Sequence, residues 1–134
     1  MDLGCYGLHV NRQLARFAGG APTIVSARGT ERSPGVDASF DIDLAFPAGA
    51  RGSIISSMTA DRYEMTLRLI GQKGEAFAHD NLLQYGDDRI EITTDAGTTV
   101  EHLGTRSTAT SQLQALADHP QHGTPLPLAV NDPV

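Results

Sequence analysis

Residues 36–46 read Val36-Asp-Ala-Ser-Phe-Asp-Ile-Asp-Leu-Ala-Phe46, with apolar side chains at every even position. Asp37, Ser39, Asp41 and Asp43 stand at odd positions between them. This period of two is typical of a β-strand that buries one face and exposes the other to water. The stretch therefore predicts a β-strand with one face in the core and the other face in water.

Turn signals on the C-terminal side of this strand predict further strands beside it. Pro47-Ala-Gly49 reads as a hairpin turn into residues 52–58, and residues 64–70 form another strand pattern. A β-rich stretch is expected to begin at residues 23–25, and shorter strands are expected at residues 75–78, 89–94 and 98–102. Consecutive hairpins give an antiparallel sheet, here with about six or seven strands.

Two helices are predicted at the ends of the chain. The first covers Met1 to Phe17, before Gly19-Gly20 and Pro22, and the second runs from Ser107 to Ala117. In the second helix we expect Leu113 and Leu116 to face the core and Pro120 to stop the helix. The predicted fold class is α+β, a large and mostly antiparallel sheet with helices packed on one face, in a single domain over residues 1–134.

The first helix carries two stripes of side chains at the spacing that aligns residues along one helix face. The polar stripe consists of Asp2, Tyr6, His9 and Gln13. The apolar stripe, which we expect to face the core, consists of Leu3, Val10, Leu14 and Phe17. The polar stripe is then expected to face a cleft beside that packing.

The composition is that of a globular protein and excludes several classes. The net charge is −6, and 40% of the 134 residues are hydrophobic and 19% charged. The acidic balance, without a run of Lys or Arg, argues against nucleic-acid binding. No segment approaches the ~20 apolar residues that span a bilayer, and the start lacks the pattern of a secretory signal. We expect a cytoplasmic protein with no membrane partner.

Cysteine and histidine usage predicts no metal site. Cys5 is the only cysteine, so it forms no internal disulfide and no thiolate cluster. His119 and His122 are three residues apart, but Pro120 stands between them and no carboxylate or cysteine pair joins them. His79 and His102 are expected to be isolated.

The aspartates of residues 36–46 stand on the outer face of the predicted sheet. A row of like charges is most often a solvated surface. An open sheet face is also a place where a second subunit packs, provided that other strands supply apolar or basic partners such as Arg68 and Ile70. A homo-oligomer through the open sheet face is therefore expected as one alternative.

The first twelve residues, Met1-Asp-Leu-Gly-Cys-Tyr-Gly-Leu-His-Val-Asn-Arg12, resemble the start of the C-terminal domain in the glucose-fructose oxidoreductase, inositol dehydrogenase and rhizopine catabolism (Gfo/Idh/MocA) family. Asp2, Gly4 and Tyr6 match the tyrosine form of its Asp-x-Gly-x-(His or Tyr) motif, as in the dihydrodiol dehydrogenase branch. Further matches follow in order at Gly35-Val36-Asp37, Phe46-Pro47-x-Gly49, Leu69-Ile70-Gly71-x-x-Gly74 and residues 107–113.

The resemblance implies the same kind of sheet and an oxidoreductase that uses NAD or NADP. In the family, an N-terminal Rossmann domain binds the cofactor, and a Glu-Lys-Pro motif supplies a catalytic lysine. Neither motif is in this chain, whose only lysine is Lys73 in a predicted turn. We expect a substrate-binding and oligomerisation domain that lacks the Rossmann domain and the family's last helix and is inactive in isolation.

The resemblance also implies roles for the polar stripe. Alcohol oxidation needs a group that takes the hydroxyl proton, and Tyr6 is the candidate, with Asp2 beside it as the second catalytic residue. His9 and Arg12 are candidates for binding a small-molecule substrate; no cofactor-binding residue is assigned. Each of these residues also has a purely structural alternative. Tyr6 can be a half-buried helix tyrosine, Asp2 a carboxylate that favours the first helix turn, His9 a structural histidine, and Arg12 part of a surface ion pair.

Three functions remain open from the sequence. The first is the C-terminal domain of an NAD(P)-dependent oxidoreductase acting on a sugar, polyol or related hydroxylated compound. The second is a non-catalytic small-molecule-binding or dimerisation module. The third is an enzyme that uses an acid–tyrosine–histidine set without a nicotinamide.

Overall fold

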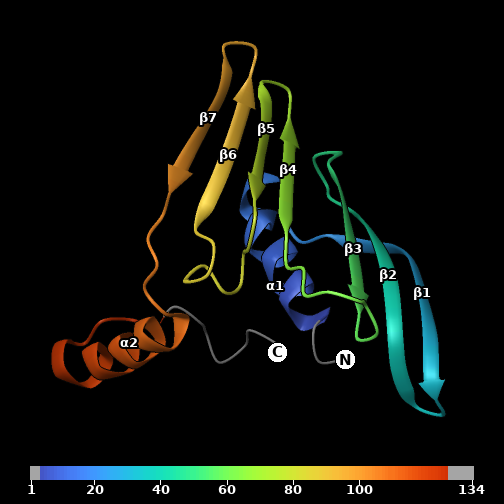
Figure 1. Cartoon of the computed structure of the whole chain (residues 1–134), viewed down its shortest axis with the longest axis horizontal. Helices are drawn as coiled ribbons and strands as arrows, with labels where there is room; N and C mark the ends of the chain where they lie inside the picture. Colours follow the sequence, from blue (N-terminus) through green and yellow to red (C-terminus); the bar gives the residue numbers. More distant parts are fainter. Residues whose placement is uncertain (1–3, 127–134) are drawn as a thin grey trace. The chain divides into compact units, whose positions relative to one another are not determined.

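A computed structural model describes residues 4–126 of the chain, which divide into two compact units, with the boundary in the sequence between Arg62 and Tyr63. Unit 1 contains helix α1 (Gly4–Leu14), a short 3-10 turn η1 (Ala15–Phe17) and strands β1 (Thr23–Ser33), β2 (Val36–Ala45) and β3 (Arg51–Ser57). Unit 2 contains β4 (Leu67–Gly71), β5 (Gly74–Ala78), β6 (Arg89–Thr94), β7 (Gly97–His102) and helix α2 (Thr108–His122). The α+β class is confirmed (Figure 1).

Sheet A in unit 1 has the strand order β1-β2-β3, with both pairs antiparallel. β2 is central, and Ile42 lies opposite Ala27 of β1 and Ile54 of β3. The buried core consists of Ile42, Leu44, Phe46 and Ile54. The alternation of β2 is confirmed at its C-terminal half, where Ile42 and Leu44 are buried and Asp41 and Asp43 are exposed, whereas Val36 at its start is 52% exposed.

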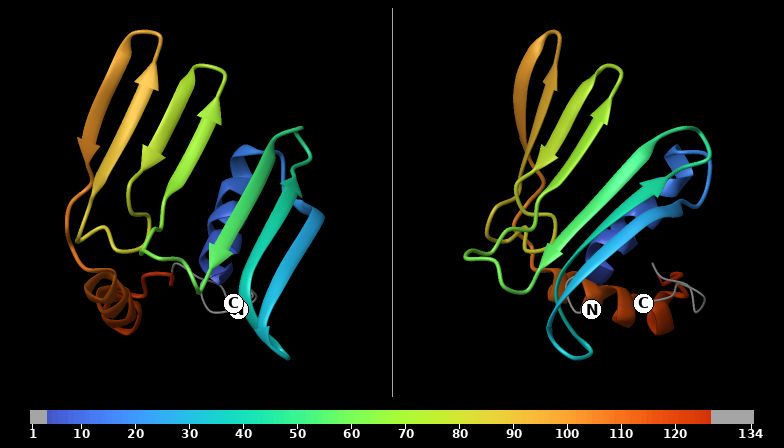
Figure 2. Two further views of the ribbon diagram at one scale, coloured as in Figure 1. Left: turned by 45° about the vertical axis from the view of Figure 1, so that its right-hand side comes forward. Right: turned by 90° about the vertical axis from the view of Figure 1, so that its right-hand side faces the viewer.

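Helix α1 packs on the inner face of sheet A, where it contacts β3 (Figure 2). Leu8 and Ala15 lie against the buried core. The hairpin between β2 and β3 is the predicted one: the Gly49 amide donates to the Phe46 carbonyl at 2.9 Å. Gly49 has φ +89°, a conformation that side chains rarely adopt.

Sheet B in unit 2 is an antiparallel meander in the order β4-β5-β6-β7. Its register aligns apolar side chains on one face: Leu67, Ala78 and Ile90 form one row, and Leu69, Ala76 and Ile92 form the next. None of the residues in these four strands is fully buried. The alternation is present, but the described part of unit 2 has no buried core.

Residues 4–126 contain seven strands, within the predicted number, but their hydrogen bonds group them into sets of three and four. The strand predicted from residue 64 begins only at Leu67. Met65 instead accepts a hydrogen bond from the Asn81 amide of a loop, at 2.9 Å. The backbone that would have extended the strand is therefore satisfied by irregular structure.

Two expectations for the second helix are wrong. α2 continues through Pro120 and ends at Gly123, whose φ is +68° and whose amide donates to the His119 carbonyl. A proline near a helix end removes a single backbone hydrogen bond, which a solvated terminal turn tolerates. Leu113 and Leu116 are 67% and 61% exposed, because α2 does not pack extensively on any strand of its unit.

The length and composition of the two helices bear on membrane insertion. Neither helix within residues 4–126 combines the length and the apolar character that a bilayer span requires.

Candidate functional site

The orientation of α1 is set by close contact between its backbone and sheet A. A Cβ atom at Gly4 would overlap the Phe40 ring, and one at Gly7 would lie 2.6 Å from Ile54 Cγ2. Only glycine permits this approach. The two glycines therefore bring the start of the helix onto the large side chains of β2 and β3.

Asn11 continues the contact along the same side of the helix. Its Nδ2 donates to the Gly7 carbonyl at 2.9 Å. Its Oδ1 would lie 2.5 Å from a Cβ at Gly52 of β3. The sequence did not predict the contact between Gly52 and Asn11, because each residue taken alone has the character of an ordinary surface residue.

The apolar stripe expected to face the core consists of Leu3, Val10, Leu14 and Phe17. Leu3 lies outside the described residues, and the other three, contrary to expectation, do not pack against the core of sheet A. Phe17 is 75% exposed, and Val10 and Leu14 are only partly buried. The helix side that meets the sheet carries Gly4, Leu8, Asn11 and Ala15 instead. The sheet supplies the bulky apolar groups here and the helix supplies the small ones, so a search for large apolar residues selects the wrong stripe.

The polar stripe lies on the side of α1 away from sheet A. With about 3.6 residues per turn, Tyr6, His9 and Gln13 fall opposite the row that meets the sheet. Tyr6 is 40% exposed, and His9 is partly buried. Asp2, the other predicted catalytic residue, lies outside the described residues. The helix thus presents Tyr6 and His9 together, one turn apart.

Arg12, the second predicted substrate-binding residue, stands on the flank of the helix rather than in line with Tyr6. The spacing of four, three and four residues aligns it with Cys5, His9 and Arg16. Arg16 stacks over the Phe17 ring, with its Cζ atom 4.8 Å from the ring centroid. The sequence spacing places these residues in one row, but the direction in which the row faces is known only once the helix side that packs on the sheet is known.

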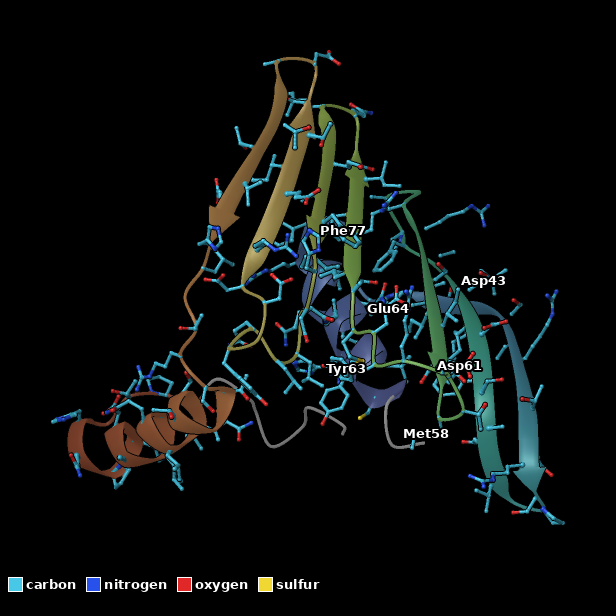
Figure 3. The ribbon with its side chains drawn as sticks, in the orientation of Figure 1. Asp43, Met58, Asp61, Tyr63, Glu64 and Phe77 are labelled. Carbon is cyan, nitrogen blue, oxygen red and sulfur yellow. The ribbon has the colours of Figure 1, made fainter. Side chains whose placement is uncertain are left out.

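A second polar cluster lies on sheet B, around His79 and Glu91. His79 Nε2 lies 2.8 Å from Glu91 Oε1, and its Nδ1 lies 3.4 Å from Arg89 Nη2. Phe77, which is labelled in Figure 3, packs edge-on against His79 with ring centroids 4.9 Å apart. Arg68 stacks over the same Phe77 ring. His79 is therefore not isolated, contrary to expectation.

Two aspartates that precede β6 are held ionised by their partners. Arg89 donates two hydrogen bonds to Asp87, at 2.8 and 2.6 Å, and this contact lowers the pKa of the Asp87 carboxyl and raises the pKa of Arg89. Asp88 lies 2.7 Å from His102 Nδ1 and accepts from the Gly104 amide, and both contacts lower its pKa. His102 is thus also paired. These contacts connect β6, β7 and the segment that leads to α2.

The described residues contain no group of three or more His, Cys, Asp or Glu side chains placed to hold a metal ion. His119 Nδ1 donates instead to the Thr124 carbonyl at 2.8 Å, beyond the end of α2.

The outer face of sheet A is mixed rather than uniformly acidic. Asp41 lies between Arg28 of β1 and Ile55 of β3 on one row of the face, and Ser26 donates to Asp43 at 2.7 Å (Figure 3). Ile55 is 81% exposed. Arg68 and Ile70, the expected partners for a subunit contact, lie on β4 in sheet B.

The chain was compared with protein-family models, with curated proteins and with solved structures. Residues 1–77 match the family model described as the GFO/IDH/MocA C-terminal domain. A search of curated proteins gave no match. Among solved structures, a candidate oxidoreductase from Erwinia carotovora atroseptica SCRI1043 aligns with a TM-score of 0.64 and 14% sequence identity. The alignment covers 92% of this chain and 40% of that one. Because the sequence identity is low, this similarity supports a shared fold alone.

Proposed function

Because the chain belongs to the GFO/IDH/MocA C-terminal domain family, which is a family of oxidoreductase domains, we propose that it forms the substrate side of an NAD(P)-dependent oxidoreductase. The proposed substrate is a sugar, a polyol or a related hydroxylated small molecule. The observation that carries this proposal is the side of α1 that faces away from sheet A, where Tyr6 and His9 stand one turn apart.

Tyr6 is the proposed proton-transfer residue, as in the tyrosine-type branch of the family. A phenol takes a proton from a substrate hydroxyl at neutral pH only where a cation or a hydrogen bond stabilises the phenolate. Lys73, the only lysine of the chain, follows β4 in the turn of unit 2. We therefore propose that the required cation comes from the family's catalytic lysine outside residues 1–134.

Residues 4–126 do not fit a dinucleotide by themselves. All strand pairs within this range are antiparallel, and no Gly-x-Gly-x-x-Gly turn joins a strand to a helix. A dinucleotide site of the Rossmann type needs both a parallel β-α-β unit and that turn. NAD or NADP is thus proposed to bind a separate domain, and this chain is proposed to be inactive alone.

His9 and Arg12 are the proposed substrate contacts. Both are partly buried on the helix that carries Tyr6, and they stand one turn apart. Imidazole and guanidinium groups can hydrogen-bond the hydroxyl oxygens of a polyol. His9 stands one turn from both Arg12 and Tyr6, so a ligand bound by His9 would lie next to the Tyr6 phenol. No nucleic-acid or membrane partner is proposed, and the proposed location is the cytoplasm.

The decisive experiment compares Tyr6→Phe with Tyr85→Phe in the protein expressed from its complete reading frame. Tyr85 is an exposed tyrosine of unit 2, so its substitution controls for a general loss of phenol groups. With NAD or NADP and a polyol panel, Tyr6→Phe is expected to lower kcat by roughly a hundredfold or more, as for a lost general acid–base. A reading frame without a dinucleotide-binding domain, or a Tyr6→Phe variant with full turnover, would contradict the proposal.

A non-catalytic role in subunit association is the second candidate function, through the outer face of sheet A. The observation in its favour is Ile55, which is 81% exposed between polar neighbours. An exposed apolar residue with charges of both signs nearby suits a contact between copies. Sedimentation of an Ile55→Asp variant tests this: weaker association than the unchanged chain is expected, and unchanged association would rule this face out.

A further inference from the structure

The outer edge of sheet B is formed by β7, which is regular along its whole length. β7 pairs with β6 from Gly97, opposite Thr94, to His102, opposite Arg89, without a register shift. All six of its residues are exposed. Since β6 occupies one side of β7, the backbone groups on its other side form a straight row in the described structure.

β7 lacks the features by which sheet edges avoid pairing with other strands. One edge strand of sheet A, β1, has three register irregularities in its pairing with β2, and it carries Arg28, Glu31 and Arg32. Bulges and charges of this kind obstruct the approach of another strand. β7 has no bulge, proline, lysine or arginine, and Glu101 is its only acidic residue.

The other edge of sheet B is also less suited to pairing. β4 carries Arg68, whose guanidinium stacks over Phe77 and approaches Glu75 at 3.8 Å. A charged side chain on an edge strand discourages edge-to-edge association. β3, the second edge of sheet A, pairs with β2 without a register shift but carries Arg51 at its start. Of the edge strands β1, β3, β4 and β7 in the described residues, β7 is the one that combines regular pairing with the absence of Lys and Arg.

The residues of β7 are complementary to themselves about a twofold axis through Val100. Two antiparallel copies then place Val100 opposite Val100, Thr99 opposite Glu101 and Thr98 opposite His102. No like charges face each other, and the hydroxyls of both threonines stand beside polar groups that they can hydrogen-bond. The β-branched run at residues 98–100 also favours an extended strand.

We propose that β7 pairs antiparallel with β7 of a second copy of this chain, so that the two four-stranded sheets join into one continuous sheet. Such pairing satisfies the outward backbone groups of both strands, and the side chains fix the register. This inference is independent of the proposed catalytic role. It also uses a different surface from the outer face of sheet A.

The first experiment measures self-association by sedimentation over about a hundredfold range of protein concentration, because dimerisation follows mass action. The unchanged chain is expected to dimerise, and Val100→Lys is expected to weaken dimerisation by tenfold or more, about 1.4 kcal/mol. Val36→Lys is the matched control, since Val36 and Val100 are both 52% exposed and both lie in strands. The control should associate like the unchanged chain.

The second experiment tests the register with a single thiol and does not depend on the lysine variant folding. In a Cys5→Ser background, Val100→Cys places two thiols across the twofold axis, where directly opposite Cβ atoms are about 5 Å apart, close to disulfide reach. Oxidation is expected to give a covalent dimer, and prior denaturation should abolish it. Val36→Cys in the same background should stay monomeric on a denaturing gel.

Three results would overturn the inference. They are a monomer at every concentration, a dimer unaffected by Val100→Lys, and a dimer in which Val100→Cys forms no cross-link. The second result, combined with a loss of association in Ile55→Asp, would assign the contact to sheet A instead.

Discussion

Sheets A and B share one sequence pattern but differ in what covers it. In sheet A, the apolar positions of β2 and β3 lie beneath α1, and Leu44 is only 3% exposed. In sheet B, the equivalent alternation in β4, β5 and β6 leaves no residue fully buried. Period-two alternation is thus sufficient for a sheet to form, whereas burial of its apolar face also requires a second layer that packs against that face.

The fit in sheet A depends on small residues as much as on large ones. Gly4 and Gly7 allow the α1 backbone to approach Phe40 and Ile54, and Gly52 makes room for Asn11. In unit 2, α2 carries Leu113 and Leu116 but does not pack extensively on the strands. Apolar side chains on a helix therefore contribute to a core only where the opposing surface allows close packing.

The largest expected effect comes from removing the same side chain in each sheet. Leu44→Ala should lower the free energy of unfolding by about 2–5 kcal/mol, because it leaves a cavity in a packed core. Leu69→Ala in sheet B should cost about 1 kcal/mol or less, since Leu69 is already 39% exposed. Urea denaturation measures both values. Equal costs would mean that sheet B is as well packed as sheet A.

A smaller destabilisation is expected from adding a methyl group where α1 packs closely on sheet A. Gly4→Ala should destabilise the chain by about 1–3 kcal/mol, although alanine is the better helix former, because its Cβ would overlap the Phe40 ring. Phe40→Leu frees part of that space, so Gly4→Ala should cost less in the Phe40→Leu background. A double-mutant cycle by thermal unfolding measures the coupling. A cost that is the same in both backgrounds would argue against the close approach.

The smallest expected effect concerns the charged segment before β6. The hydrogen bond from Arg89 lowers the pKa of Asp87 below its ordinary value of 3.8, so the pair stabilises the fold above that pH. The stabilisation is lost as the pH falls from 3.8 through the lowered pKa, because over this range the unfolded chain binds a proton at Asp87 that the folded chain does not. Asp87→Asn should destabilise the chain slightly at neutral pH, and the difference should shrink in acid.

Asp61→Asn provides the control for this effect, because Asp61 is exposed and lies in the other unit. Its urea midpoint should follow that of the unchanged chain across the same acid range. A difference between Asp87→Asn and the unchanged chain that persists at the lowest pH would argue against an electrostatic origin.

Local sequence patterns predicted most of the secondary structure. The alternation of residues 36–46 gave β2 within one residue of its end, and residues 89–94 coincide with β6. The start of β4 and the end of α2 were wrong by several residues, because a loop hydrogen bond to Met65 and a solvated helix end overrode local preference. Element type is set by neighbours in sequence, whereas element ends depend on contacts that are distant in it.

The candidate site was predictable in composition but not in orientation. The spacing of Tyr6 and His9 indicated a shared helix side, and the structure has them on the side away from sheet A. The direction in which the row of Arg12 and Arg16 faces and the pairing of His79 with Glu91 were not visible in the sequence. Such neighbours depend on helix rotation and on strand register, which no short stretch of sequence specifies.

The sequence by itself determined the α+β class, the antiparallel hairpins and the polar stripe of the first helix, because side-chain periodicity is a local property of the backbone. Only the tertiary structure decided which side of α1 is buried, that sheet A has a core while sheet B has none in the described residues, and that β7 ends its sheet with a regular edge. These depend on close approach at Gly4, Gly7 and Gly52 and on cross-strand register. Both are relations between segments rather than properties of any one of them.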